Sequence, residues 1–537
     1  MNISSGYLKK IEYLLFVFTI AAFWGCGGGA SSNGSDIIIG DSQVKMDSSI
    51  QDIENIKDLI ESGDIGEDIE VGIEVSSDIT DTYEDISDAG LDVSDISGCE
   101  ISDPKHLWNK GFGGSSNDYG YSVSVDSSGN VYITGSFYSP TIDFGGGSLT
   151  NAGNADIFLA KFDSNGKHLW SKRFGGSDWD EGTSVSLDSS GNVYITGYSG
   201  SSTIDFGGGS LTNTGNADIF LAKFDSDGKH LWSKRFGGND YDYSYSVSVD
   251  SSGNVYITGY FRSSTIDFGG GLLTNAGNSD IFLAKFDRNG NYLWSKRFGE
   301  SDYDEGHSVS VDSSGNVYIT GYFRSSTIDF GGGVLTNAGN SDIFLARFDS
   351  NGNHLWSKRF GGSDYDEGNS VSVDISGNVV YITGYFSSST IDFGGGVLTN
   401  AGGQDIFLAK FDSNGNHKWS KRFGGSNWDV GHSVSVDSSG NVYITGYFRN
   451  STIDFGGGSL TNTGENDIFL ARFDSNGNHL WSKRFGGSSD DYGYSISVDS
   501  SGNLYGTGYF HSINIDFGGC LPLSAWSYDI YLIKYKP

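Results

Sequence analysis

The sequence predicts an all-β fold: a single seven-bladed β-propeller of four-stranded antiparallel blades, closed by pairing of the N- and C-terminal strands and preceded by a disordered acidic tether. A unit of 62 residues returns seven times, with one step of 63 where Val379–Val380 carries an extra residue. Glycine is abundant (81 of 537 residues) and proline is scarce (4), which is typical of many short strands joined by tight turns. Units of this size cannot bury a core singly, so seven of them form one body. A tryptophan marks the period at Trp108, Trp170, Trp232, Trp294, Trp356, Trp419 and Trp481.

Residues 1–26 have the features of an export signal. Lys9 and Lys10 form a basic start, and the apolar run from Tyr13 to Trp24 is too short to span a membrane comfortably. The run ends in Gly25-Cys26, which resembles a bacterial lipoprotein signal, although Phe23 stands where Leu is usual. We therefore expect a lipid anchor at Cys26 and an extracytoplasmic location at the outer membrane or cell surface. An ordinary secretory peptide or an uncleaved anchor is the alternative.

Residues 27–105 differ sharply from the rest of the chain. They hold 21 acidic and 3 basic residues and almost no aromatic ones. Such a segment buries too little apolar surface to offset the entropy of ordering, so it is expected to be a disordered, extended linker. A short amphipathic helix around 50–60 is the competing interpretation.

Each unit of the region 106–537 contains four strand-like segments, shown here by the second unit. Residues 184–188 alternate serine with aliphatic residues, 193–198 are β-branched and aromatic, and 218–224 and 230–236 follow a Gly-rich insertion and a turn. The small Ser-Val-Ser segment suits the innermost strand, where blades crowd the axis. The bulky Trp-bearing segment suits the rim.

The order of the segments predicts how the ring closes. The units open with a rim strand, His106–Phe112, and the last one ends at its third strand, Asp529–Tyr535. We expect these two segments to pair, which removes an exposed sheet edge. A disulfide between Cys99 and Cys520 would reinforce this closure in an oxidising compartment, and two unpaired thiols are the alternative.

The segment 120–135 reads Gly-Tyr-Ser-Val-Ser-Val-Asp-Ser-Ser-Gly-Asn-Val-Tyr-Ile-Thr-Gly and has six counterparts. It resembles the bacterial seven-bladed beta-propeller repeat (SBBP) over about four fifths of the chain. The resemblance implies an extracytoplasmic or surface propeller, and it implies neither one activity nor any catalytic residue. The insertion with Thr-Ile-Asp-Phe-Gly-Gly-Gly (203–209) is longer than this resemblance implies.

The connections from rim strand to inner strand are the candidate binding surface, together with the insertions expected on the same face. One column of these connections is aspartate in every unit, and the column before it is mostly aromatic. Carboxylates beside aromatic rings suit Ca²⁺ or a sugar, but DxDxDG spacing is lacking, so the metal is unknown and no other cofactor is expected. The alternative is that each aspartate binds backbone N–H groups and shapes its loop. The columns are Asp118, Asp180, Asp242, Asp304, Asp366, Asp429 and Asp491, and Trp179, Tyr241, Tyr303, Tyr365 and Trp428.

The histidines indicate no catalytic site. Six of them begin rim strands and are expected to be exposed beside a turn, while His307 and His432 follow the acidic connections without a Ser or Cys partner. The rim pair Lys172-Arg173 is interpreted as a solvated edge that discourages sheet pairing. The six are His106, His168, His230, His354, His417 and His479.

The sequence favours a lipid-anchored binding or scaffold module that contacts the membrane only through its lipid and recognises a protein or carbohydrate. A net charge of −34 disfavours nucleic acid as a partner, and a monomer is expected. The alternatives are an enzyme of lyase or glycosidase type, or a purely structural surface protein. We predict no enzyme, because nearly identical blades bring no acid–base pair together at the positions where they differ.

Overall fold

The computed structural model of the chain describes residues 36–39, 42–45, 104–374, 376–519 and 522–536. The chain forms two compact units, Met1–Asp95 and Ile96–Pro537. In the first unit the described residues are a hairpin of β1 (Asp36–Ile39) and β2 (Ser42–Lys45), which the linker prediction did not include. The signal, the lipidation at Cys26, most of the linker and the Cys99–Cys520 pair lie outside the described residues. No helix among the described residues has the length and hydropathy to cross a membrane.

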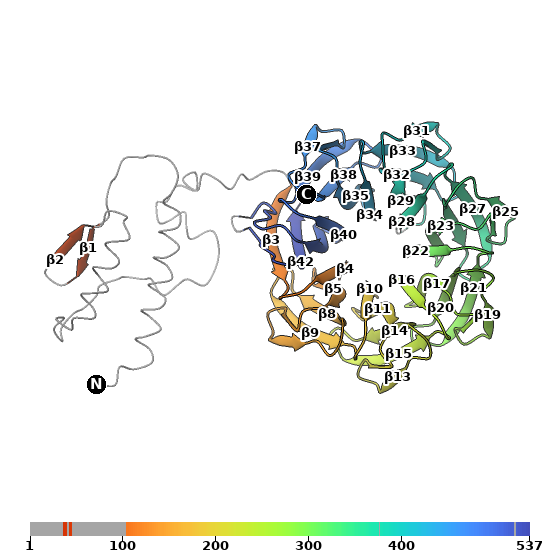
Figure 1. Cartoon of the computed structure of the whole chain (residues 1–537), viewed down its shortest axis with the longest axis horizontal. Helices are drawn as coiled ribbons and strands as arrows, with labels where there is room; N and C mark the ends of the chain where they lie inside the picture. The colour runs from red at the N-terminus through yellow and green to blue at the C-terminus, as the bar shows by residue number, and fades with distance from the viewer. Residues whose placement is uncertain (1–35, 40–41, 46–103, 375, 520–521, 537) are drawn as a thin grey trace. The chain divides into compact units, whose positions relative to one another are not determined.

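Seven four-stranded antiparallel sheets form a ring, which confirms the predicted fold class (Figure 1). From the axis outward, blades 1 to 6 are β4-β5-β8-β9, β10-β11-β14-β15, β16-β17-β20-β21, β22-β23-β26-β27, β28-β29-β32-β33 and β34-β35-β38-β39. The inner strands are β4 (Asp118–Val125), β10 (Asp180–Leu187), β16 (Asp242–Val249), β22 (Asp304–Val311), β28 (Asp366–Val373), β34 (Asp429–Val436) and β40 (Asp491–Val498). The second strands are β5 (Val131–Phe137), β11 (Val193–Ser199), β17 (Val255–Phe261), β23 (Val317–Phe323), β29 (Val379–Phe386), β35 (Val442–Phe448) and β41 (Leu504–Phe510).

The two outer positions of each blade complete the sheet. The third strands are β8 (Asp156–Phe162), β14 (Asp218–Phe224), β20 (Asp280–Phe286), β26 (Asp342–Phe348), β32 (Asp405–Asp412), β38 (Asp467–Phe473) and β42 (Asp529–Lys536). The rim strands are β9 (His168–Phe174), β15 (His230–Phe236), β21 (Tyr292–Phe298), β27 (His354–Phe360), β33 (His417–Phe423), β39 (His479–Phe485) and β3 (Lys105–Phe112). Second and third strands are buried on both faces, because each blade packs between two others.

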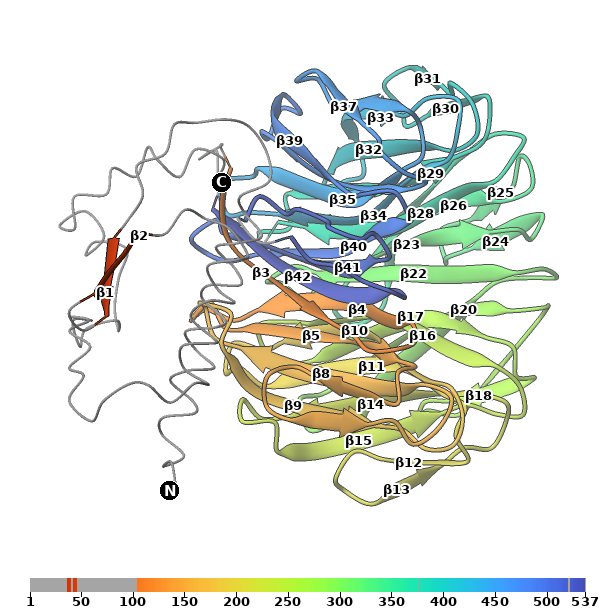
Figure 2. The same ribbon diagram turned by 60° about the vertical axis from the view of Figure 1, so that its left-hand side comes forward.

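The ring closes as the segment order predicts. Blade 7 is β40-β41-β42-β3, and β3 pairs antiparallel with β42 from Lys105↔Lys536 to Phe112↔Ile530 (Figure 1, Figure 2). The Trp108 indole and the Lys534 ammonium both donate to the carbonyl of Ser164 in blade 1, at 3.1 and 2.8 Å. The closing contact therefore repeats the one between blades 1 and 2, where Trp170 and Lys161 donate to the carbonyl of Ser226.

Serines of the inner strands hold neighbouring blades together near the axis. The backbone N–H of Val185 donates to Ser122 Oγ of the preceding blade at 3.1 Å, and Val123 donates to Ser495 Oγ across the closure at 3.2 Å. The equivalent bond is present at all seven interfaces. The Ser-Val-Ser pattern thus supplies both small side chains and the acceptors of a continuous circle.

The Gly-rich insertions form small hairpins on the outer wall (Figure 1), which corrects the expectation that they lie on the binding face. In blade 2 the hairpin buries Ile204 and Phe206 against the neighbouring blade, with the ring of Phe206 5.0 Å from that of Phe174 and 4.9 Å from that of Phe220. The apolar pair explains why the insertion turns outward and down the interblade seam. The hairpins are β6–β7 (Thr141–Asp143, Ser148–Thr150), β12–β13 (Thr203–Asp205, Ser210–Thr212), β18–β19 (Thr265–Asp267, Leu272–Thr274), β24–β25 (Thr327–Asp329, Val334–Thr336), β30–β31 (Thr390–Asp392, Val397–Thr399) and β36–β37 (Thr452–Asp454, Ser459–Thr461).

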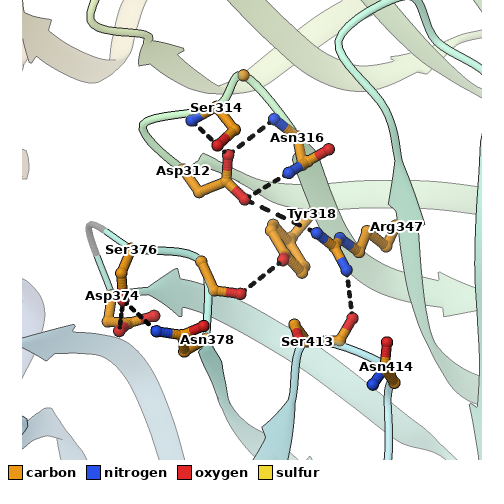
Figure 3. Close-up of polar contacts among 12 residues, drawn as sticks. Asp312, Ser314, Asn316, Tyr318, Arg347, Asp374, Ser376, Asn378, Ser413 and Asn414 are labelled. Atoms are coloured by element: carbon orange, nitrogen blue, oxygen red, sulfur yellow. Dashed lines mark hydrogen bonds and ion pairs between the residues drawn. The ribbon is translucent and has the colours of Figure 1, made fainter.

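One face of the ring, the turn face, carries the Asp-Ser-Ser-Gly-Asn turns between inner and second strands and the turns before the rim strands. Figure 3 shows this face at blades 4 and 5. Asp312 accepts bonds from the N–H groups of Ser314 and Asn316 at 2.9 Å and lies 3.9 Å from Arg347, which also donates to the next blade. The polar groups of these turns are thus bonded within the ring itself. We call the opposite face, with the rim-to-inner connections, the loop face.

Candidate functional site

The seven-fold aspartate column lies at the start of the inner strands, on the loop face. All seven carboxyl groups are fully buried. Asp304 accepts from the backbone N–H groups of Glu300, Arg324 and Ser325 at 3.0 to 3.1 Å and from Ser325 Oγ at 2.6 Å. Burial raises the pKa of Asp242 and of Asp429 to about 6. The carboxylates accept hydrogen bonds from the connections of their own blades, and this geometry supports their interpretation as loop-shaping residues.

The aromatic column is placed differently, because its side chains reach the surface. Trp179 and Trp428 are 52% and 55% exposed, and Tyr241 and Tyr365 are 41% and 42% exposed. Tyr303 lies between two guanidinium groups, 5.4 Å from Arg262 and 5.9 Å from Arg324. Aromatic and arginine side chains therefore alternate over part of the loop face, in the geometry of cation–π contacts.

A β-bulge in each inner strand redirects one side chain toward the neighbouring blades. The register shifts at the same place in all seven blades, for example between Gly306 and Ser308, so that the intervening residue has no partner across the sheet. We call these seven residues the axial ring. They differ from blade to blade: Tyr121, Thr183, Tyr245, His307, Asn369, His432 and Tyr494.

Members of the axial ring contact one another across the interfaces. His307 Nδ1 lies 3.3 Å from Asn369 Oδ1, and its ring centroid is 5.4 Å from that of Tyr245. His432 stacks on Tyr494 at 4.5 Å. Asn369 Nδ2 donates to the carbonyl of Gly431 in blade 6 at 3.0 Å.

The residues two positions earlier form a second variable set, which we call the upper ring. They are Tyr119, Glu181, Tyr243, Glu305, Glu367, Val430 and Tyr492. Tyr243 stacks on Tyr198 of blade 2 at 3.9 Å, and Glu181 accepts a bond from the hydroxyl of Tyr138 at 3.2 Å. Large side chains of the upper ring thus fill these two interfaces beside the axis.

The pKa values of the two histidines of the axial ring are shifted in opposite directions. Burial lowers the pKa of His307, but its contact with Glu305, whose carboxylate is 3.8 Å away, and the nearby charge of Glu367 raise it above the ordinary value overall. Burial lowers the pKa of His432 to about 4. Glu305 and His307 thus form an ion pair at positions where the blades differ, which the sequence analysis did not anticipate.

A cavity of about 370 Å³ opens beside the axis between blades 5 and 6. Val430 is the only small side chain of the upper ring, so the space that Tyr243 fills between blades 2 and 3 stays open here. We call it the blade 5–6 pocket. Its lining is Glu367, Asn369, Tyr385, Gln404, Trp428, Val430, His432 and Tyr447.

Two other sets of residues are more tightly bound than the sequence indicates. The rim arginines pair with buried aspartates, as Arg359 does with Asp342 at 3.1 Å, so the basic pair is not merely a solvated edge. His168 packs against its hairpin, since a Cβ on Gly146 would lie 2.2 Å from His168 Cε1. Among the described residues, no group of three or more His, Cys, Asp or Glu side chains has the arrangement of a metal site.

Sequence reasoning missed the axial ring, the upper ring and the pocket. The signal was present as two variable columns inside an otherwise nearly constant repeat. Their meaning required the assembled ring, because residues of different blades, such as His307 and Asn369, meet only across an interface.

Seven segments of the chain match the family model described as a beta-propeller repeat, SBBP: residues 110–136, 169–204, 231–260, 293–322, 355–385, 418–447 and 480–509. Each match runs from the rim strand through the connection to the second strand. The chain therefore carries seven repeats of this type, and each repeat begins within one rim strand.

Two curated proteins are similar over large parts of the chain. An uncharacterised WD repeat-containing protein of Acanthamoeba polyphaga mimivirus is 23% identical over 81% of this chain and 38% of its own length. The regulatory protein FlaEY of Caulobacter vibrioides is 24% identical over 53% of this chain and 32% of its own length. The chain thus spans about a third of the length of these relatives. Among solved structures, the WD40 beta-propeller domain of Doa1 matches with a TM-score of 0.42 and 9% identity, over 81% of this chain and 97% of that domain.

Proposed function

We propose that this chain of seven SBBP repeats is a binding module whose recognition surface is the loop face around the propeller axis. One observation carries the proposal: the repeats are nearly constant in the residues that build the frame, and they differ in the axial ring, the upper ring and the residues beside them. A residue that only shapes a blade would be expected to be the same in every blade. Side chains that differ around one axis suit a ligand that has no seven-fold symmetry.

The exposed aromatic and arginine side chains support the same face. Trp179 and Trp428 are each about half exposed, and rigid aromatic groups supply large contact area at low entropic cost. The Arg324 guanidinium lies 5.2 to 5.9 Å from the rings of Tyr303, Tyr322 and Tyr365, which holds it in place on the surface. The partner class we propose is a protein segment or a carbohydrate.

A matched pair of variants tests the proposal. The purified protein is applied to an array of immobilised glycans and peptides, and saturable signals are compared with those of two triple variants. Trp179→Ala, Tyr303→Ala and Arg324→Ala change the loop face, while Asn165→Ala, Asn351→Ala and Asn476→Ala change exposed turn-face positions. We expect the first set to lose the signal by about tenfold or more and the second to keep it. The proposal is contradicted if the turn-face variant loses the signal while the loop-face variant keeps it, or if both variants keep it.

The proposal includes export and lipid anchoring, which rests on Lys9, Lys10, the apolar run and Gly25-Cys26. Radiolabelled palmitate should be incorporated into the chain in bacteria and should be absent from Cys26→Ser. Labelling of the variant, or a wild-type protein that stays in the cytoplasm, would contradict this part.

Catalysis is the second candidate, and the Glu305–His307 contact favours it. A carboxylate and an imidazole 3.8 Å apart beside the axis are suited to general acid–base chemistry. If the protein cleaves a polysaccharide, His307→Gln should abolish turnover and leave thermal unfolding unchanged. Equal activity of this variant and the wild type would place catalysis elsewhere or exclude it.

A further inference from the structure

Two residues that break the repeat, Gln404 and Val430, line the blade 5–6 pocket, and a third, Gly403, lies against Trp428 of that pocket. Val430 stands where the other blades have Glu or Tyr, and it leaves the cavity open. Gly403 stands where blades 1 to 4 have Asn154, Asn216, Asn278 and Asn340, and Gln404 stands where they have Ala or Ser. Blade 6 departs at the same two positions, with Glu465 and Asn466, but there the upper ring of the next blade carries Tyr492, so the three departures coincide at the blade 5–6 interface alone.

Gly403 and Gln404 fix the indole of Trp428 at this cavity. A Cβ at residue 403 would lie 2.5 Å from Trp428 Cδ1, so the ring rests directly against the glycine backbone. The backbone of Gln404 accepts from the N–H of Asp429 at 2.8 Å and donates to the carbonyl of Asn427 at 3.1 Å, which holds the backbone on both sides of Trp428. The tryptophan is therefore positioned and still 55% exposed.

The polar groups of the pocket are available to a ligand. Within the described part of the chain, the side chains of Gln404 and His432 and the indole N–H of Trp428 make no hydrogen bond. The side-chain amide of Asn369 already forms hydrogen bonds with His307 and with the carbonyl of Gly431. Burial raises the pKa of the Glu367 carboxyl above its ordinary value, although the charges of His307 and Arg324 and a hydrogen bond with Tyr385 act in the opposite direction.

We propose that the blade 5–6 pocket binds one uncharged pyranose ring, either as a free sugar or as a residue of a glycan, with Trp428 against the apolar face of the ring. Unpaired amide, imidazole and indole groups suit hydroxyls, which both donate and accept hydrogen bonds. A cavity of about 370 Å³ is near the lower end of small-ligand sites, which suits one or two rings. The positive charges of His307 and Arg324 beside Glu367 favour a neutral ligand over a cation. This inference rests on the proposed function, since it names a ligand class for part of the same face.

The test is a titration of the full-length protein with the methyl glycopyranosides of glucose, galactose and mannose and with N-acetylglucosamine, using glucosamine and glucuronate as charged controls. The tryptophan indole resonances of the nitrogen-labelled protein report the site, and Trp428→Phe assigns the relevant signal. We expect at least one neutral sugar to shift that resonance saturably, with a dissociation constant on the order of 1 mM.

Two variants that copy natural residues of other blades should weaken binding by about tenfold or more. Val430→Tyr places in the pocket the side chain that blades 1, 3 and 7 carry at this position, and Gly403→Asn copies blades 1 to 4 and displaces the indole. Tyr243→Val opens the equivalent space between blades 2 and 3, and it should leave the affinity unchanged. Thermal unfolding of each variant shows whether the fold is kept.

The proposal is overturned if no neutral sugar shifts the Trp428 resonance up to about 20 mM, if the shift survives Val430→Tyr undiminished, or if glucosamine or glucuronate binds more than about tenfold tighter. Shifts by free glycosides indicate a free sugar as sufficient ligand, and binding only to immobilised glycans indicates a residue within a chain. If the sugars fail while another array ligand still depends on the loop face, the ligand class is wrong and the binding proposal stands. If sugars bind at Trp428 and the loop-face triple variant changes no array signal, recognition is confined to the pocket and the wider loop face is excluded from the binding surface.

Discussion

The turn face and the loop face come from the same seven repeats but differ in how much the blades vary. On the turn face, the Asp-Ser-Ser-Gly-Asn turn recurs with one change, Ile375 for Ser, and its carboxylate is consumed by local N–H groups. On the loop face, the axial and upper rings carry Tyr, Thr, His, Asn, Glu and Val at equivalent positions. The difference indicates that the fold needs the same residues in every blade on the turn face, whereas it tolerates different side chains at the axial and upper rings of the loop face.

The largest effect on stability is expected at the aspartate column, which is constant in all blades although it lies on the variable loop face. Asp304→Ala removes a buried carboxyl group that accepts from three backbone N–H groups and from the Ser325 hydroxyl. Leaving such donors unsatisfied should lower the free energy of unfolding by about 3 kcal/mol or more. Urea denaturation measures the loss. A stable variant that instead loses a Ca²⁺-binding heat would return this column to the functional residues.

Tryptophans of the rim give a smaller, paired comparison. The Trp170 indole donates to the carbonyl of Ser226 at 3.1 Å. Trp481 Nε1 has no hydrogen-bond partner among the described residues, since no turn joins β42 to β3 in blade 7. Trp170→Phe should therefore cost about 1 kcal/mol more than Trp481→Phe, the net value of one hydrogen bond. Equal losses in urea denaturation would show that the bond to the turn does not stabilise the interface.

Blade 7 also lacks the arginine that pairs with the buried aspartate elsewhere, since Gly111 takes its place. Burial and the charge of Asp118 raise the pKa of Asp529 to about 7. A raised pKa means that the folded state holds the proton more tightly, so this contribution to stability is lost as pH rises through about 7. Asp529→Asn should raise the midpoint of thermal unfolding by about 2 °C at pH 8 and change it little at pH 5.

The matched control is Asp342→Asn, which leaves Arg359 without its carboxylate partner. Burial raises the pKa of Asp342 only to about 6, because Arg359 acts against it, so Asp342→Asn should raise the unfolding midpoint at pH 8 less than Asp529→Asn does. An equal or larger rise for Asp342→Asn would refute the role given to the missing arginine.

The smallest effect on stability is expected at exposed positions of the loop face. Tyr365 is 42% exposed, and its ring contacts Arg324 at 5.3 Å. Tyr365→Ala should change the free energy of unfolding by no more than about 0.5 kcal/mol, measured in urea. A loss comparable to that of Asp304→Ala would make the aromatic column part of the frame.

The sequence was sufficient for the architecture because the fold repeats one pattern. The period, the Ser-Val-Ser inner segment and the placement of His106–Phe112 predict blade number, strand order and closure. The insertion was misplaced because its direction depends on burial of Ile204 and Phe206 in a seam that exists only between assembled blades. The pocket was missed for a related reason: Gly403, Gln404 and Val430 become neighbours only across an interface.

The most direct test of the account is hydrogen exchange of the full-length protein with and without a saturating ligand found on the array. The account predicts slowed exchange in loop-face segments such as residues 177–183, 301–307 and 426–432, and unchanged exchange in turns such as 126–130 and 312–316. Slowed exchange confined to the turn face or to the outer hairpins would contradict the central claim that the variable face is the binding face.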